Sequence, residues 1–263
     1  MENEKRTYMI NRWTKDETIL ALSVYCKIPF NKASNTNPEI VRIANLIGRT
    51  PASVKMKVGN FGSFDPELKA RGIVGLSNTS KLDDEVWYEY CNEWEKLAYD
   101  SELIIARLQN KTIEESIGLD IEMLPKGEER SRMVKQRINQ DFFRETVLAS
   151  YNYRCCISGI SEPQLIEACH IIGWSKDVIN RTNPQNGLCL NQLFHKAYDS
   201  YLVGITPDLN IKISDELLTS TTDVVFQNYL VGLCDRKIIM PDKFFPQKEF
   251  LEINYKKYKS ING

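Results

Sequence analysis

Residues 164–201 read QLIEACHIIGWSKDVINRTNPQNGLCLNQLFHKAYDSY and contain the most informative pattern in the chain. The run 164–171 is short, mostly apolar and typical of a β-strand. The Asn, Pro and Gly residues of 183–187 indicate a turn, and 193–201 fits a helix. The segment therefore predicts a strand, a loop and a helix in close succession.

The sequence contains two histidines, His170 and His195. A three-histidine metal site and an HExxH zinc-protease helix are therefore excluded. Asp199 follows His195 by four residues, so on a helix the two share one face and can bind one divalent cation. The predicted strand and loop place His170 opposite that face. A cation with two or three protein ligands keeps positions for water and a phosphate oxygen.

The order and spacing of these residues resemble the HNH endonuclease family, which is built on the ββα-metal fold. The resemblance implies that His170, in EACHI, is the general base that takes a proton from the attacking water. It implies that Asn186, in NPQNGL, braces the loop and helps to orient this base. His195 and Asp199 match the metal-binding positions of the family's helix. The implied products of phosphodiester hydrolysis have 5′-phosphate and 3′-hydroxyl ends.

The surrounding sequence resembles the branch of this family found in bacterial restriction and defence nucleases. The segments that carry this likeness are LIEACHIIGWS, NGLCL, HKAYDSYLVGI and the upstream VKQRINQDFFRETVLASYNYRCCISG. The resemblance spans roughly residues 126–263.

Cys169 departs from the family pattern, because many members have Asp or His directly before the base as another metal ligand. A thiolate is soft and suits zinc better than Mg²⁺, which prefers oxygen ligands. Two interpretations stay open for Cys169, a third ligand or a buried structural thiol. The expected cofactor is a divalent cation, Mg²⁺, with Mn²⁺ or another transition metal as the alternative. Cys155 and Cys156 lack the CxxC spacing of a structural zinc ribbon.

Residues 14–62 predict three helices. The first begins with a TKDE capping box at Thr14, the second opens at Pro38, and the third begins at Thr50. The segment 43–61, IANLIGRTPASVKMKVGNF, resembles helix-turn-helix modules, which place a basic helix in the major groove. The predicted DNA contacts of this module are Arg49, Lys55, Lys57 and Asn60. The alternative is a helical bundle that only packs on the rest of the protein.

The net charge of −1 is the sum of opposed patches. Residues 40–64 carry four basic and no acidic side chains, whereas 83–102 carry eight acids and one base. Residues 126–154 carry seven basic and four acidic side chains. Basic stretches of this kind favour double-stranded DNA as the partner. The expected phosphate-binding residues of the last stretch are Arg137, Arg144 and Arg154.

The Gly- and Ser-rich stretch 63–80 and the LPKG sequence at 124–127 predict two boundaries. They divide the chain into a helical DNA-recognition-like domain (1–80), an acidic helical linker (81–125) and an HNH nuclease domain (126–263). The expected fold class is α+β and mostly helical, with a helix-turn-helix-like N-terminal domain before a ββα-metal domain.

The predicted function is a restriction or phage-defence DNA endonuclease. It is expected to act as a homodimer, because one HNH site cuts one strand. The alternative is a DNA-binding or regulatory protein with an inactive HNH module. A serine hydrolase is disfavoured because the chain has no G-x-S-x-G elbow. The sequence lacks a membrane-spanning apolar run, and its first six residues lack a signal-peptide core, so we expect a cytoplasmic protein without a membrane partner.

Overall fold

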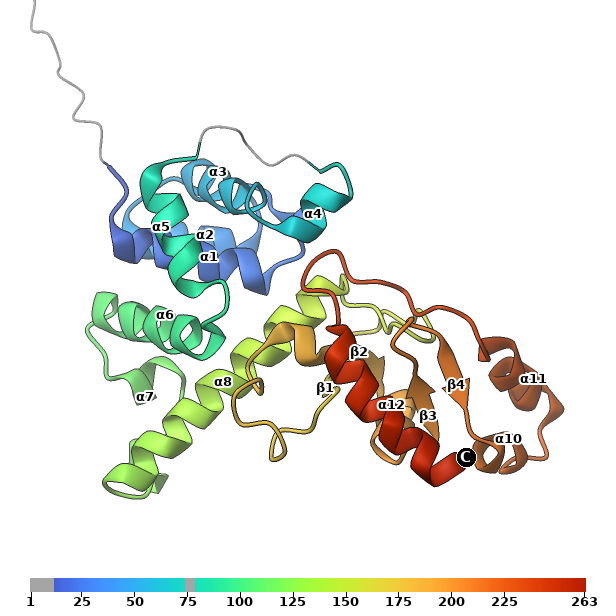
Figure 1. Cartoon of the computed structure of the whole chain (residues 1–263). Coiled ribbons are helices and arrows are strands. Elements are labelled where there is room, and N and C mark those ends of the chain that lie inside the picture. The colour runs from blue at the N-terminus through green and yellow to red at the C-terminus, as the bar shows by residue number, and fades with distance from the viewer. Residues whose placement is uncertain (1–11, 74–78) are drawn as a thin grey trace, which may run out of the picture.

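The computed structural model describes residues 12–73 and 79–263. The first six residues, on which the signal-peptide prediction rests, and part of the Gly- and Ser-rich boundary lie outside these ranges. The chain is mostly helical and has two small antiparallel sheets in its C-terminal half (Figure 1). The prediction of a mostly helical α+β fold is therefore confirmed.

The three predicted N-terminal helices are α1 (Lys15–Lys27), α2 (Pro38–Ile47) and α3 (Pro51–Phe61). Local sequence fixes where they begin. The Thr14 hydroxyl accepts from the Glu17 amide, and the Glu17 carboxylate accepts from the Thr14 amide. This reciprocal capping box satisfies two amide groups that the first helical turn would leave unpaired.

The acidic region forms two helices, α5 (Lys81–Tyr90) and α6 (Trp94–Leu108), which pack in one core with α1, α2 and α3. Trp87 and Trp94 are buried in this core. The core therefore continues across residue 80, and the region predicted as a linker packs as part of the helical half. Shorter elements of this half are η1 (Phe30–Lys32), α4 (Pro66–Ala70), α7 (Ile113–Ser116) and η2 (Ile121–Met123).

The long helix α8 (Glu128–Ser150) belongs to both halves of the molecule (Figure 1). Its Ile138 and Phe142 are buried in the N-terminal core, whereas Phe143 and Val147 are buried in the C-terminal core. Because one continuous helix supplies both cores, it fixes the two halves relative to each other.

The C-terminal core contains β1 (Ile166–His170), β2 (Gly187–Asn191) and α9 (Gln192–Asp199). β1 and β2 are antiparallel, with His170 opposite Gly187. A Cβ on Gly187 would lie 2.3 Å from Cγ2 of Val147. Glycine therefore lets the start of β2 approach α8 closely. The remaining elements are η3 (Pro184–Asn186), β3 (Val203–Ile205), β4 (Ile211–Ile213), α10 (Asp215–Thr219), α11 (Val224–Leu233) and α12 (Lys248–Asn262).

Residues 242–247, which we call the strap, connect the C-terminal half to the N-terminal core. Lys243 is fully buried, and its ammonium donates to the carbonyl oxygens of Tyr25 and, at 2.9 Å, Ile28. The Phe244 ring packs edge-on against Trp94 at a centroid distance of 5.1 Å. The strap therefore completes a core that the N-terminal helices begin.

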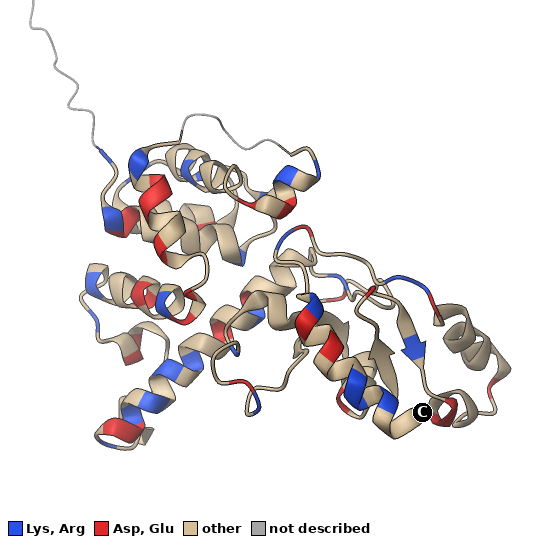
Figure 2. Ribbon diagram, viewed as in Figure 1, with Lys and Arg blue, Asp and Glu red and all other residues tan. Residues whose placement is uncertain are grey.

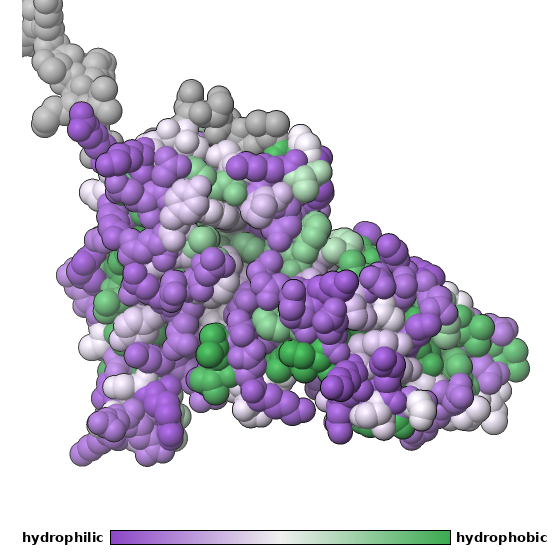
Figure 3. Space-filling model, in the orientation of Figure 1, coloured by the Kyte–Doolittle hydropathy of each residue, from purple (hydrophilic) through white to green (hydrophobic). Residues whose placement is uncertain are grey.

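Charged residues are distributed unevenly over this fold, and basic side chains recur along the first part of α8 (Figure 2). The face seen in Figure 3 is largely hydrophilic, with apolar side chains scattered among the charged ones. Within residues 12–73 and 79–263, no helix combines the length and apolar character needed to cross a bilayer.

Candidate active site

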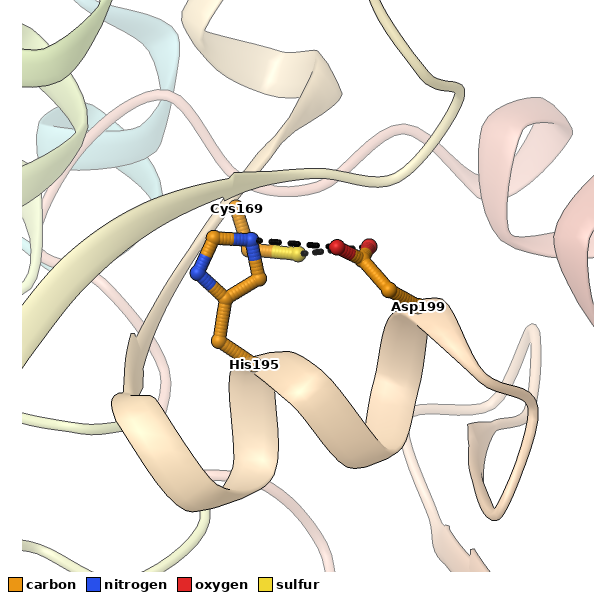
Figure 4. A group of neighbouring side chains, drawn as sticks. All are labelled: Cys169, His195 and Asp199. Atoms are coloured by element: carbon orange, nitrogen blue, oxygen red, sulfur yellow. Dashed lines mark hydrogen bonds and ion pairs between the residues drawn. The ribbon is translucent and has the colours of Figure 1, made fainter.

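Three possible metal ligands meet where β1 faces α9. His195 and Asp199 lie on α9, and Cys169 lies on β1 (Figure 4). Their donor atoms all lie within 4.8 Å of one another. Asn191 caps α9 by accepting from the Phe194 amide at 2.9 Å. The start of the helix, and with it the direction of His195, is therefore fixed by a local cap.

Glu167 supports this group and was missed in the sequence analysis. Side chains alternate along a strand, so Glu167 and Cys169 leave β1 on the same side. Glu167 Oε2 lies 2.6 Å from Nδ1 of His195. A carboxylate accepts hydrogen bonds, so Nδ1 carries the proton and the Nε2 lone pair is available to a cation. The signal in the sequence was the two-residue spacing of Glu167 from Cys169.

This donor set fits a divalent cation. Metal–ligand distances of 2.0–2.3 Å allow donor atoms to be at most about 4.6 Å apart, so small side-chain movements close the group around an ion. Nε2 of His195 already lies 3.5 Å from Asp199 Oδ2. The Asp199 carboxylate suits Mg²⁺ or Mn²⁺, the His195 imidazole suits transition metals such as zinc, and the thiol adds a further ligand that zinc prefers.

The Cys169 thiol is completely buried, and its Sγ lies 3.9 Å from Asp199 Oδ1. Burial raises the pKa of this thiol well above its ordinary value, and the Asp199 charge adds to the effect. The side chain is therefore a neutral thiol in the structure, while its position beside Asp199 keeps it within reach of a shared ion.

His170 lies at the end of β1, where its ring stacks on Phe143 at a centroid distance of 3.7 Å. Its Nε2 lies 2.8 Å from the carbonyl oxygen of Arg181. A carbonyl only accepts, so Nε2 carries the proton and Nδ1 of the neutral ring retains a lone pair. Burial lowers the pKa of His170, which favours this neutral form.

Asn186 is buried beneath the turn that follows His170. Its Oδ1 accepts from the Ile172 amide at 2.8 Å, and its Nδ2 donates to the carbonyl oxygens of Ile172 and Asn180 at 3.1 and 3.2 Å. These bonds tie the turn after His170 to the loop that carries Arg181. Asn186 therefore holds the backbone after His170 and the loop of the Arg181 carbonyl in fixed positions around the His170 ring.

A cleft of about 290 Å³ brings these groups together. The predicted base and the predicted metal ligands of α9 both line it. Its lining includes His170, Trp174, Lys176, His195, Tyr198 and Asp199. We call it the active-site cleft.

Residues 155–206 match the family model described as HNH endonuclease. This segment of the chain is therefore similar to an HNH endonuclease domain. No curated protein and no solved structure matches the chain. The matched segment contains Glu167 and every residue that lines the active-site cleft from β1, from the loop after it and from α9.

The sequence predicts a basic face on α3 that contacts DNA, but in the structure part of this face packs against α5. Lys57 is buried, with its Nζ 2.5 Å from Asp83 Oδ1, and Asn60 Nδ2 donates to the other Asp83 oxygen at 3.0 Å. The start of α5 therefore covers this part of α3 and pairs with both side chains, and their contact with DNA stays a prediction. Arg49 pairs with Glu17, whereas Lys55 is exposed.

Arg137, Arg144 and Arg154, the other predicted phosphate contacts, are exposed on α8 and the turn after it. Arg137 is paired with Asp141 at 2.9 Å. None of the three belongs to the described lining of the active-site cleft. Their contact with DNA stays a prediction.

Replacing Glu167 by glutamine should weaken the binding of Mn²⁺ or Zn²⁺ by about 10- to 100-fold, because His195 loses the carboxylate that orients its ring. Isothermal titration calorimetry measures this change. Glu162→Gln is the matched control, since Glu162 is an exposed carboxylate just before β1. Equal affinities of the two variants would show that Glu167 does not orient the ligand.

Proposed function

We propose that the protein is a metal-dependent DNA endonuclease in which His170 is the general base. The observation that carries the proposal is the active-site cleft, which is lined by both His170 and the His195 and Asp199 pair. The match of residues 155–206 to HNH endonucleases supports the same reaction.

The negative charge of a phosphodiester repels nucleophiles, so its hydrolysis requires an activated water and a group that neutralises the charge. Nδ1 of His170 takes a proton from water, while the Arg181 carbonyl holds the opposite edge of the ring. Asn186 fixes the loop that supplies this carbonyl. Nε2 of His195 and the Asp199 carboxylate are the groups that would hold Mg²⁺, or Mn²⁺ or another transition metal. A bound cation would neutralise the phosphate and stabilise the departing 3′ oxygen.

We further propose that the substrate is double-stranded DNA and that the enzyme belongs to a restriction or phage-defence system. The sequence likeness of residues 126–263 to that branch of the family supports this. One site cuts one strand, so cleavage of both strands would use a homodimer. The alternative is a DNA-binding or regulatory protein whose HNH module is inactive, and the complete set of His170, Asn186 and His195 argues against it.

Incubation with supercoiled plasmid tests the proposal. We expect nicked or linear DNA with ligatable 5′-phosphate ends when Mg²⁺ or Mn²⁺ is present, and no cleavage in EDTA. Unmodified, methylated and hydroxymethylated DNA should be compared, because base modification distinguishes the targets of defence nucleases. If all three stay intact with Mg²⁺, Mn²⁺ and Zn²⁺, the inactive-module alternative replaces the proposal.

A further inference from the structure

A second and larger cleft adjoins the active-site cleft. It has a volume of about 600 Å³ and lies between the segment after β1 and helix α12. The two clefts lie next to each other, because they share lining residues. The shared residues are Ile171, Gly173, Lys176, Tyr201 and Asn254.

The larger cleft is basic. Lys176, Lys256 and Lys257 line it, and all three are exposed. Asp177 is the one acidic residue in its described lining. The carboxylate of Asp177 accepts from the amides of Ile179 and Asn180 and from the Asn180 side chain. That acidic charge is therefore directed into its own loop, so the lysines set the charge of a cleft whose walls also include the apolar side chains of Ile171, Ile172 and Ile253.

Helix α12 is held firmly at this position. Asn254 is buried and donates from Nδ2 to the carbonyl oxygen of Ile171 at 2.9 Å, one residue after the proposed base. The Tyr258 ring packs so closely on Gly204 that a Cβ there would lie 2.8 Å from the ring. α12 is thus fixed to both β1 and β3, although it lies outside the segment matched by the HNH model.

We propose that α12 forms the second wall of the substrate groove, and that Lys176, Lys256 and Lys257 bind the backbone phosphates that neighbour the scissile phosphate on the DNA strand that is cut. The inference rests on the proposed function. Lysine ammonium groups are mobile point charges, which suits contacts to phosphates regardless of base sequence. Because this cleft lies beside the active-site cleft, a DNA strand with its scissile bond at His170 would carry its neighbouring phosphates past these lysines.

The test is a double variant, Lys256→Gln with Lys257→Gln, which removes both charges and leaves polar, unbranched side chains that are only slightly shorter. The matched control is Lys248→Gln with Lys259→Gln, because these lysines lie on the same helix and line neither cleft. Binding of a fluorescent DNA duplex is measured by anisotropy in EDTA, so that binding is separated from cleavage.

We expect the Lys256 and Lys257 variant to bind about 10- to 30-fold more weakly at 0.15 M salt. The slope of log affinity against log salt should become shallower by about 1 for each lysine. KM for cleavage should rise while kcat stays close to that of the wild type. Lys176→Gln should change the slope by about 1 as well.

Two results would overturn the inference. One is an unchanged slope and KM in the Lys256 and Lys257 variant, and the other is an equal change in the Lys248 and Lys259 control. Either result leaves the proposed function intact as long as the wild type cuts DNA. Failure of the wild type to cut any DNA instead overturns the proposed function, while the slopes still report whether α12 binds nucleic acid.

Discussion

Replacing His170 by alanine should lower the rate of DNA cleavage by about 10²- to 10⁴-fold, the range typical of a lost general base. Without the imidazole, water near the scissile phosphate has no acceptor with a suitable pKa. The residues that would hold the cation, His195 and Asp199, stay in place. We therefore expect metal affinity and DNA binding to change little, and single-turnover cleavage of plasmid DNA to measure the loss.

Two further measurements separate lost chemistry from lost structure. His170→Gln keeps a side chain against Phe143 and a donor for the Arg181 carbonyl, so it should fold like the wild type and still be inactive. Imidazole added to the alanine variant can occupy the space left by the ring and should restore part of the activity. Cleavage by His170→Ala at the wild-type rate would show that another group activates the water.

Replacing Lys57 by methionine should lower the free energy of unfolding by about 3–5 kcal/mol. Lys57 and Asp83 form a buried ion pair, with 5% and 0% of their side-chain surfaces exposed. Burial opposes ionisation of Asp83, yet hydrogen bonds from Lys57, the Ser80 amide and Asn60 outweigh it and lower the pKa of this carboxyl. The methionine variant would leave that charge buried without its ammonium partner. Urea unfolding at neutral pH measures the loss.

Lys55→Met is the matched control, because Lys55 lies on the same helix but is exposed. Its effect should stay within about 0.5 kcal/mol. Changing Asp83 to leucine in the Lys57→Met background removes the unpaired charge and should recover much of the stability. Equal stability of Lys57→Met and Lys55→Met would contradict the buried pair and return Lys57 to the predicted DNA-binding face.

The elements that sequence predicted well are those set by local signals. Thr14 begins α1 through its own capping box, and the side-chain oxygens of Asn37 and Thr50 accept from backbone amides in the first turns of the next two helices. The strand, turn and helix around His170 follow from composition and from the four-residue spacing of His195 and Asp199. Such signals act within a few residues, so they can be read without knowing the tertiary fold.

The features that sequence did not predict depend on contacts between distant segments. Lys57 lies on the polar side of α3 by periodicity, but Asp83, 26 residues later, covers that side. Glu167 reaches His195 only because β1 packs beside α9. The basic cleft forms because α12 returns to the end of β1. Each case needs a pairing of elements that the helical or strand period of one segment does not specify.

The buried Lys243 has a consequence for the order in which the chain folds. Its two acceptors, the carbonyl groups of Tyr25 in α1 and of Ile28 directly after α1, precede it by 218 and 215 residues. Helix α1 therefore leaves the ribosome long before Lys243 is synthesised, and until then the carbonyl groups at its end lack the Lys243 ammonium as a donor. We expect the N-terminal helices to stay loosely packed on the nascent chain and to consolidate only once the strap emerges.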